Sequence, residues 1–130
     1  ITYDDAKIPA DLNYQNLAAV KSYLMRRTNE ILDQIEDSIA DPKQIDQFYR
    51  SALLKAMDDC WVDQVAYLGY LKTLVQPWTL LQRNPMAVYH EKAYDRFKQM
   101  IDAVTQEAIR NLLLSTVALN EDGEVVVYFV

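Results

Sequence analysis

The chain is poor in residues that break regular structure and in residues that build metal or disulfide sites. Its 130 residues include only two glycines, four prolines, one histidine and one cysteine. So few glycines and prolines predict long, uninterrupted elements. The single cysteine, Cys60, excludes an internal disulfide and any site built from several cysteines. Because Cys60 lies within a helical apolar pattern, we expect it to be a small buried side chain.

Catalytic groups are equally scarce. His90 is the only histidine, which excludes a histidine cluster around a metal, and its charged helical surroundings predict an exposed position. A phosphate-binding loop needs two closely spaced glycines followed by lysine, and Gly69 with Gly123 cannot supply one. We therefore expect no catalytic residue, cofactor or metal in this chain, and no nucleotide hydrolysis by the chain alone. The acidic residues that could suggest a helical metal site are expected to face water: Glu36, Asp37, Asp58, Asp59 and Asp63.

Charge and hydropathy narrow the class of protein further. The 19 acidic and 13 basic residues give a net charge of −6, which argues against a nucleic-acid partner, because binding phosphates needs a basic face. No apolar run reaches the ~18–20 residues that a membrane-spanning helix needs. Apolar residues make up 51% of the chain, which is enough for a modest core. Residue 1 is isoleucine, so we expect the chain to be part of a longer polypeptide.

Apolar side chains recur at helical spacing over the first half of the chain. A first helix is predicted from Tyr14 to about Ala40, with Asn13 as its capping residue. A second helix is predicted over Pro42–Val75. Its start carries a strong signal, because Asp41 offers a carboxylate to free backbone N–H groups and proline fits the first helical position. Gln44 would complete a capping box.

A third helix is predicted from Pro85 to about Val117, with Asn84 as its capping residue. Two long helices joined by a short loop must run antiparallel, as an αα-hairpin. We expect the second helix to pack through a stripe formed by Leu53, Met57, Trp61, Val65, Leu68, Leu71 and Val75.

The end of the chain changes character. Asp122–Gly123 stands between two β-prone runs, which predicts a hairpin turn. The run "EVVVYFV" lacks the alternation of a half-exposed strand, so we expect it to be covered on both faces or to join another sheet's edge. The predicted fold is therefore mainly α, with a long helix, an antiparallel αα-hairpin and a short C-terminal β segment.

The loop "QPWTLLQ" between the second and third helices carries large apolar residues, although loops normally face water. One interpretation is that Trp78 and Leu80 pack against the first helix or the C-terminal strand. The other is that they form a hairpin tip that presents apolar side chains to a partner. Composition alone leaves both open.

Residues 61–100 carry a spaced series of a tryptophan, a leucine–lysine pair, a Gln-Arg-Asn-Pro motif and aromatic residues. The series consists of Trp61, Asp63, Leu71, Lys72, Leu81, Gln82, Arg83, Asn84, Pro85, Tyr89, Tyr94, Phe97 and Met100. It resembles the helical scaffold and two-helix finger of SecA, the motor ATPase of bacterial protein export. The resemblance is close over 61–100 and looser from about Asp41 to Val117. It implies that residues 1–40 end a helical wing-like region, that 41–117 form scaffold and finger, and that 118–130 are a β-prone tail.

The resemblance also implies a role for the apolar loop. In this family the finger enters the cytoplasmic mouth of the SecY channel, and its tip meets the unfolded preprotein. The corresponding tip residues are Trp78, Thr79, Leu80 and Leu81. The implied partners are the motor domains of the same longer chain, a SecY-type channel, the preprotein and accessory Sec proteins. ATP with Mg²⁺ would be bound by those motor domains, and the parent would lie at the inner face of the cell membrane.

Three positions depart from the housekeeping pattern of the family. Leu80 stands where tyrosine is usual, Trp78 replaces a basic residue, and Pro77 is atypical. These departures indicate a divergent or accessory SecA. The apolar tail "VVVYFV" also differs from the basic or metal-binding tail of many members, and it would dock on a missing domain or an accessory partner.

Two other classes of function remain possible on the sequence besides the export motor. A stand-alone helical adaptor would bind partners through the same hairpin and would have no motor in its native chain. A helical-bundle enzyme is the least supported class, because the inward-facing Glu-x-x-His ligand pairs of di-metal bundles are missing.

Overall fold

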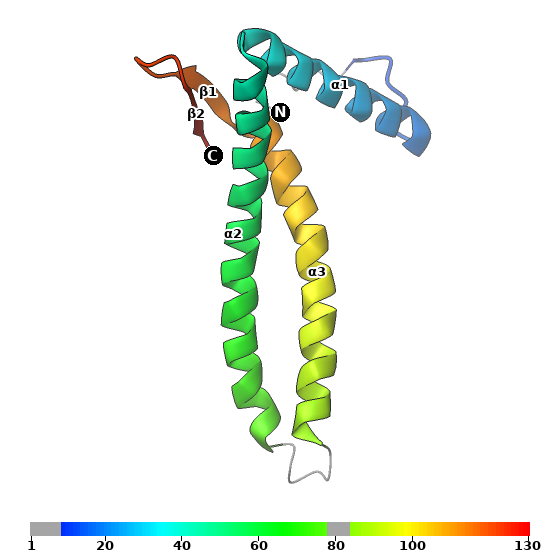
Figure 1. Cartoon of the computed structure of the whole chain (residues 1–130). Coiled ribbons are helices and arrows are strands. Elements are labelled where there is room, and N and C mark those ends of the chain that lie inside the picture. The colour runs from blue at the N-terminus through cyan, green and yellow to red at the C-terminus, as the bar shows by residue number, and fades with distance from the viewer. Residues whose placement is uncertain (1–8, 78–83) are drawn as a thin grey trace. The chain divides into compact units, whose positions relative to one another are not determined.

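The computed structural model describes residues 9–77 and 84–130. These residues form the helices α1 (Leu17–Ser38), α2 (Pro42–Val75) and α3 (Pro85–Leu114), and the strands β1 (Thr116–Leu119) and β2 (Val125–Tyr128) (Figure 1). The predicted fold class, mainly α with a short C-terminal β segment, is therefore confirmed. The chain divides into two compact units, one with the residues up to Ala52 together with Ile109–Val130, the other with Leu53–Ala108.

Helix α1 begins later than the sequence predicts. The capping residue is Asn16, whose side-chain oxygen accepts hydrogen bonds from the N–H groups of Ala18 and Ala19 at 3.1 and 3.3 Å. Asn13 instead accepts from the N–H of Gln15, in a turn that precedes the helix. Both asparagines offer the same capping chemistry, and the prediction chose the wrong one of the two.

Helix α2 begins as predicted, at Pro42, and the carboxylate of Asp41 accepts from the N–H of Lys43 at 3.0 Å. The expected capping box does not form. The side-chain oxygen of Gln44 accepts instead from the N–H of Val125, at 2.9 Å. Gln44 therefore ties strand β2 to the first turn of α2.

The core of the first unit lies where α1, the start of α2 and the end of α3 meet. Phe48 is fully buried there, and Ile31 and Ile39 contribute the buried residues of α1 and its C-cap. Asn111 of α3 is also buried, and its side-chain N–H donates to the backbone oxygen of Ala52 at 3.1 Å. A buried amide with a direct partner avoids the cost of an unpaired polar group.

A second polar contact joins α1 to α2 in this unit. The hydroxyl of Tyr49 donates to the carboxylate of Glu36. Glu36 is half-buried, so the prediction that this carboxylate faces water is wrong. The others, Asp37, Asp58, Asp59 and Asp63, are exposed as predicted.

The C-terminal strands form the predicted antiparallel hairpin, in which Val117 pairs with Val127 and Leu119 pairs with Val125. The turn is held by Asn120, whose side-chain oxygen accepts from the N–H groups of Asp122 and Glu124. Gly123 has a φ of 78°, a conformation that glycine adopts without steric cost. Helix α3 ends at Leu114, so the expected extension to Val117 is wrong, because strand pairing takes over from Thr116.

In the second unit α2 and α3 run antiparallel and side by side, as the hairpin prediction required (Figure 1). The predicted contact face of α2 is largely wrong. Leu71 and Val75 are buried as expected, but most of the expected stripe is 47–53% exposed: Leu53, Met57, Trp61 and Val65. We call these four residues the exposed apolar stripe. The buried row lies next to it on the helix and consists of Ala52, Ala56, Cys60 and Gln64.

The two faces of α2 can be compared with one substitution at two positions. Leu71 is 1% exposed and Leu53 is 47% exposed. We expect Leu71→Ala to lower the free energy of unfolding by about 2–5 kcal/mol, because it leaves a cavity in a packed contact. Leu53→Ala should cost no more than about 1 kcal/mol, since much of this side chain already meets solvent. Urea unfolding followed by circular dichroism measures both. Equal losses would mean that the buried face is assigned wrongly.

Tyr49 provides a test of the α1–α2 contact by pH. Burial, followed by the hydrogen bond to Glu36, raises the pKa of Tyr49 from 10.0 to about 12. Because the folded chain holds this proton more tightly, the stabilisation is fully present below the unfolded pKa and is lost as pH rises through the folded pKa. The stability advantage over Tyr49→Phe should therefore shrink as pH rises from 10 to 12, by no more than about 1 kcal/mol, because solvent screens a partly exposed pair. An advantage that stays constant over this window would contradict the contact.

Candidate functional site

The end of the hairpin is organised by a helix cap. The side-chain oxygen of Asn84 accepts from the N–H groups of Met86 and Ala87 at 3.0 and 3.4 Å, and Pro85 takes the first position of α3. This is the predicted start of the third helix. Its motif neighbours Gln82 and Arg83 lie outside the described residues. The predicted tip residues also lie outside them: Trp78, Thr79, Leu80 and Leu81. Their contact role stays a prediction.

The remaining residues of the 61–100 series take different environments. On α3, Tyr89 is half-buried, and its ring meets that of His90 edge-on at 5.9 Å between centroids. Tyr94 and Phe97 are 62% and 42% exposed. His90 is exposed, as predicted. Within residues 9–77 and 84–130 no group of three or more histidine, cysteine, aspartate or glutamate side chains could hold a metal ion.

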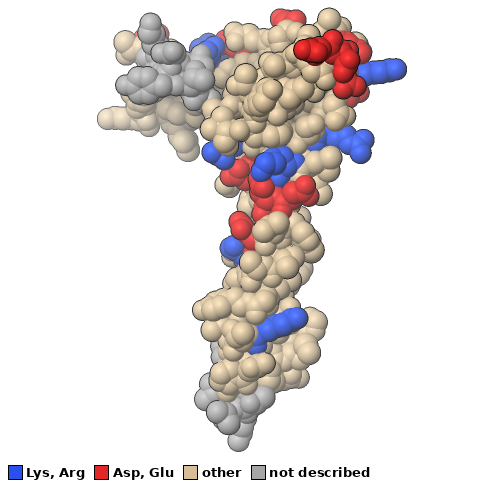
Figure 2. Space-filling view, turned by 90° about the vertical axis from the view of Figure 1, so that its left-hand side faces the viewer, with Lys and Arg blue, Asp and Glu red and all other residues tan. Residues whose placement is uncertain are grey.

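Charge is distributed unevenly along the second unit. Between Gln64 and His90 the only charged residues are Lys72 and Arg83, although the whole chain carries a net charge of −6. On the face drawn in Figure 2, the surface next to the lower group of grey residues is largely tan, with blue but no red. We call residues 64–77 and 84–90, in which Lys72 is the only charged residue, the charge-poor end of the hairpin. Its large exposed side chains are Val65, Tyr70, Leu74 and Met86.

The exposed apolar stripe lies further along α2. Its four members follow one another at four-residue spacing, so they lie along one side of the helix. Val62 and Leu54, which are 66% and 46% exposed, add to the same region. A contiguous apolar surface of this kind is typical of a protein contact site. Helical spacing in the sequence groups the four residues of the stripe, but it predicts that they contact the third helix; Val62 and Leu54 were not predicted as part of this face.

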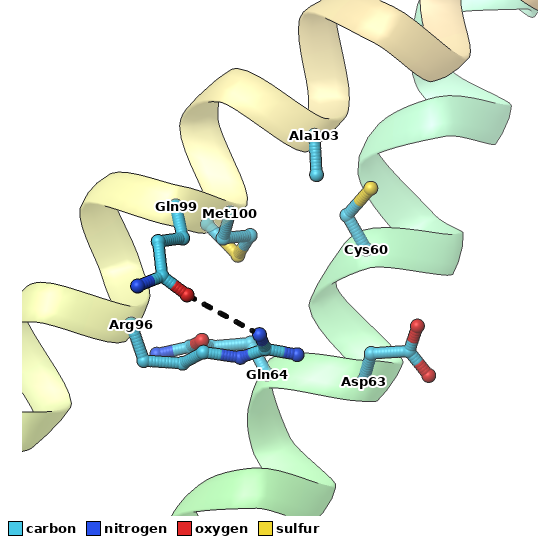
Figure 3. A pocket seen from close by; sticks show the side chains of 7 residues that line it. All are labelled: Cys60, Asp63, Gln64, Arg96, Gln99, Met100 and Ala103. Atoms are coloured by element: carbon cyan, nitrogen blue, oxygen red, sulfur yellow. Dashed lines mark hydrogen bonds between the residues drawn. The ribbon is translucent and has the colours of Figure 1, made fainter.

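A polar cluster lies between α2 and α3 in the second unit and was missed by the sequence analysis. Cys60 and Gln64 are buried on α2, and the half-buried Arg96 faces them from α3 (Figure 3). The guanidinium of Arg96 lies over the ring of Tyr67, at 5.2 Å from its centroid, and donates to the side-chain oxygen of Gln99 at 3.5 Å. Gln64 continues the four-residue spacing of Ala56 and Cys60, which is the sequence signal that could have found it.

Cys60 is buried, as predicted, and its surroundings disfavour the thiolate form. Burial raises the pKa of Cys60, and the carboxylates of Glu107 and Asp63 add to the rise. A thiol with a raised pKa and little access to solvent carries little thiolate, which is the nucleophilic form. The cluster therefore offers hydrogen bonding rather than covalent chemistry.

Comparison with known proteins assigns the chain to a family. Residues 3–116 match the model of the SecA wing and scaffold domain, so the chain belongs to this family. This agrees with the resemblance carried by residues 61–100. In the part of the chain that the structure describes, no helix is long and apolar enough to cross a membrane.

The curated relatives include protein translocase subunits from species of Streptococcus and Staphylococcus. The chain is 36% identical over 115 residues to protein translocase subunit SecA 2 of Streptococcus agalactiae serotype V, covering 88% of this chain and 14% of the relative. It is 34% identical over 128 residues to the SecA 2 subunit of Streptococcus sanguinis, covering 98% and 16%. It is 27% identical over 129 residues to that of Staphylococcus aureus strain Newman, covering 99% and 16%. The chain therefore spans about a sixth or less of these relatives. No solved structure is a significant match.

The reactivity of Cys60 tests the assignment of the buried row. We expect the native thiol to react with a soluble disulfide reagent at least about tenfold more slowly than an exposed thiol, because burial limits access and thiolate formation. The matched control is Val62→Cys in a Cys60→Ser background, since Val62 is 66% exposed on the same helix. Unfolding in urea should remove the difference. A native Cys60 that reacts as fast as the control would contradict its burial.

Proposed function

We propose that this chain is the scaffold and two-helix finger of a SecA-type protein-export motor of the accessory class. Its membership of the SecA wing and scaffold family carries this proposal. The names of the relatives, protein translocase subunit SecA 2, support the accessory class. The antiparallel α2–α3 hairpin with its charge-poor end gives the proposal a physical basis.

The proposed substrate contact is made by the tip of the hairpin: Trp78, Thr79, Leu80 and Leu81. An exported polypeptide presents changing side chains, so its contact cannot depend on reading one sequence. Apolar burial suits this task because it is non-directional. Charged side chains suit it poorly, because their desolvation costs energy unless each one finds a partner. The scarcity of charge between Gln64 and His90 supports a contact with unfolded preprotein and a SecY-type channel.

The proposed coupling surface is the exposed apolar stripe of α2. In the longer protein it would pack against the motor domains, which would bind ATP with Mg²⁺ and perform its hydrolysis. A continuous helix of 34 residues is about 51 Å long at 1.5 Å per residue, so it can connect a motor contact to a distant tip. The chain itself would then supply no catalytic group. The parent would act at the inner face of the cell membrane, with accessory Sec proteins as further partners.

A stand-alone helical adaptor is the second candidate, and the exposed apolar stripe is the observation that favours it. Such a protein would use the stripe to bind a partner without any motor. The size of the native polypeptide in its source cells distinguishes the two functions. A band several times larger than 15.1 kDa that is retained on an ATP resin supports the motor, and a band at that mass supports the adaptor.

The tip assignment is tested by Leu80→Asp and Trp78→Asp in the full-length polypeptide that carries this chain. Each change should reduce export at least about tenfold, because losing the burial of one large apolar side chain removes about 1.5–3 kcal/mol and 1.4 kcal/mol is a factor of ten. Export of a radiolabelled preprotein into membrane vesicles measures the effect.

The matched control for the tip is Leu119→Asp, an apolar-to-acidic change at a 60% exposed position of β1. It should leave export unchanged within the error of the assay. Leu80→Tyr, which introduces the residue usual in housekeeping members of the family, should retain export. Undiminished export in both aspartate variants would contradict the tip assignment.

A further inference from the structure

Arg96 of α3 is a half-buried cation whose contacts in the hairpin are both neutral. Among residues 9–77 and 84–130, its guanidinium contacts the ring of Tyr67, at 5.2 Å from the centroid, and the side-chain oxygen of Gln99, at 3.5 Å. A charged group that leaves water needs a partner of opposite charge to offset its lost hydration. The hairpin therefore satisfies this guanidinium only in part.

Two carboxylates lie near Arg96, and neither forms an ion pair with it in the described part of the chain. Asp95 pairs instead with Lys98, at 3.1 Å between Oδ1 and Nζ. Asp63 is exposed, and its side chain points away from the guanidinium (Figure 3). Both acids still lower the local positive charge, so they disfavour an anion with more than one charge at this position.

A pocket of about 210 Å³ lies beside the guanidinium in the second unit. Each of its lining side chains carries a polar group: Tyr67, Lys92, Asp95, Arg96 and Gln99. Arginine has five N–H donors in a fixed planar arrangement, and here one of them reaches Gln99. The ring contact and this hydrogen bond hold the guanidinium at the pocket wall, so other donors remain for a planar acceptor.

We propose that this pocket is a binding site for a single carboxylate group, which Arg96 holds through its remaining N–H donors. A carboxylate matches a guanidinium in shape and accepts two parallel hydrogen bonds from it. Lys92 lines the same pocket and adds positive charge from one turn earlier on α3. The carboxylate belongs to an aspartate or glutamate in another domain of the same polypeptide. This assignment rests on the proposed function, in which the chain is part of a longer export motor.

A tethered carboxylate suits the pocket better than a dissolved one. An ion pair near the surface contributes little by itself, so a free carboxylate would bind weakly. A carboxylate on a domain of the same polypeptide acts at a high effective concentration, which allows a weak contact to form. The chain spans only 14–16% of its curated relatives, and a polypeptide of their length has room for such a domain.

The direct test uses Arg96→Lys in the full-length polypeptide that carries this chain. A carbodiimide condenses an amine with a carboxylate that touches it, so that an amide bond forms and the carbodiimide takes up the water as a urea. Mass spectrometry of the digested product should show position 96 joined to one aspartate or glutamate outside residues 1–130. This crosslink should be at least about tenfold more abundant than any from Gln106→Lys, which places an amine at an exposed position of the same helix.

The pair of Lys98 with Asp95 serves as an internal positive control, because its amine and carboxylate already touch. With that control present, the absence of a crosslink from position 96 would overturn the proposal. A crosslink only to Asp63 or Asp95 would also overturn it, because the hairpin would then supply the carboxylate itself. A crosslink to a different polypeptide would reject the tethered domain as the source.

A second measurement compares Arg96→Gln in the full-length polypeptide and in the 130-residue chain. Amide hydrogen exchange over residues 92–99 should accelerate at least about threefold more in the full-length polypeptide, because only this form contains the carboxylate. Equal acceleration in both forms would reject the site. The size of the native polypeptide tests the proposed function separately. A band at 15.1 kDa would refute the longer motor, whereas a longer motor without the crosslink refutes only this site.

Discussion

The row of small side chains on α2 is the constraint on which the rest of the second unit depends. Ala56 and Cys60 occupy little volume, so α3 can approach closely, but they bury little apolar area. Larger side chains at Leu71 and Val75 therefore supply much of the apolar contact at the far end of the pair. The same choice of face leaves the exposed apolar stripe outside, because it occupies the neighbouring row of the helix.

The two ends of α2 and the start of α3 were predictable, because residues next to each helix end determine them. An aspartate or asparagine followed by proline satisfies the first N–H groups and sets the backbone, and both such pairs in this chain start a helix. The turn at Gly123 was predictable for a similarly local reason, because glycine adopts a positive φ without steric cost. The start of α1 was not predictable in this way, because Asn13 and Asn16 offer the same capping chemistry three residues apart. The end of α3 was misplaced because pairing of Val117 with Val127 is a non-local interaction.

The choice of contact face on α2 could not be read from spacing alone. Two adjacent rows share the four-residue period, and the row with larger apolar residues is the natural prediction for a core. The structure uses the row with Cys60 and Gln64 instead, opposite Arg96 on α3. From the sequence, Arg96 of α3 is expected to face solvent because it is charged. The pattern does not show that the ring of Tyr67 lies under its guanidinium. The family resemblance, by contrast, required only residues 61–100 in order, and it was confirmed over most of the chain.

The proposed function requires two kinds of contact along one hairpin. A partner that is always the same, such as a motor domain, can be met by a fixed row of large apolar side chains on a continuous helix. A partner whose sequence changes, such as a translocating polypeptide, is better met where charge is scarce, because each unpaired charge would add a desolvation cost that depends on the sequence.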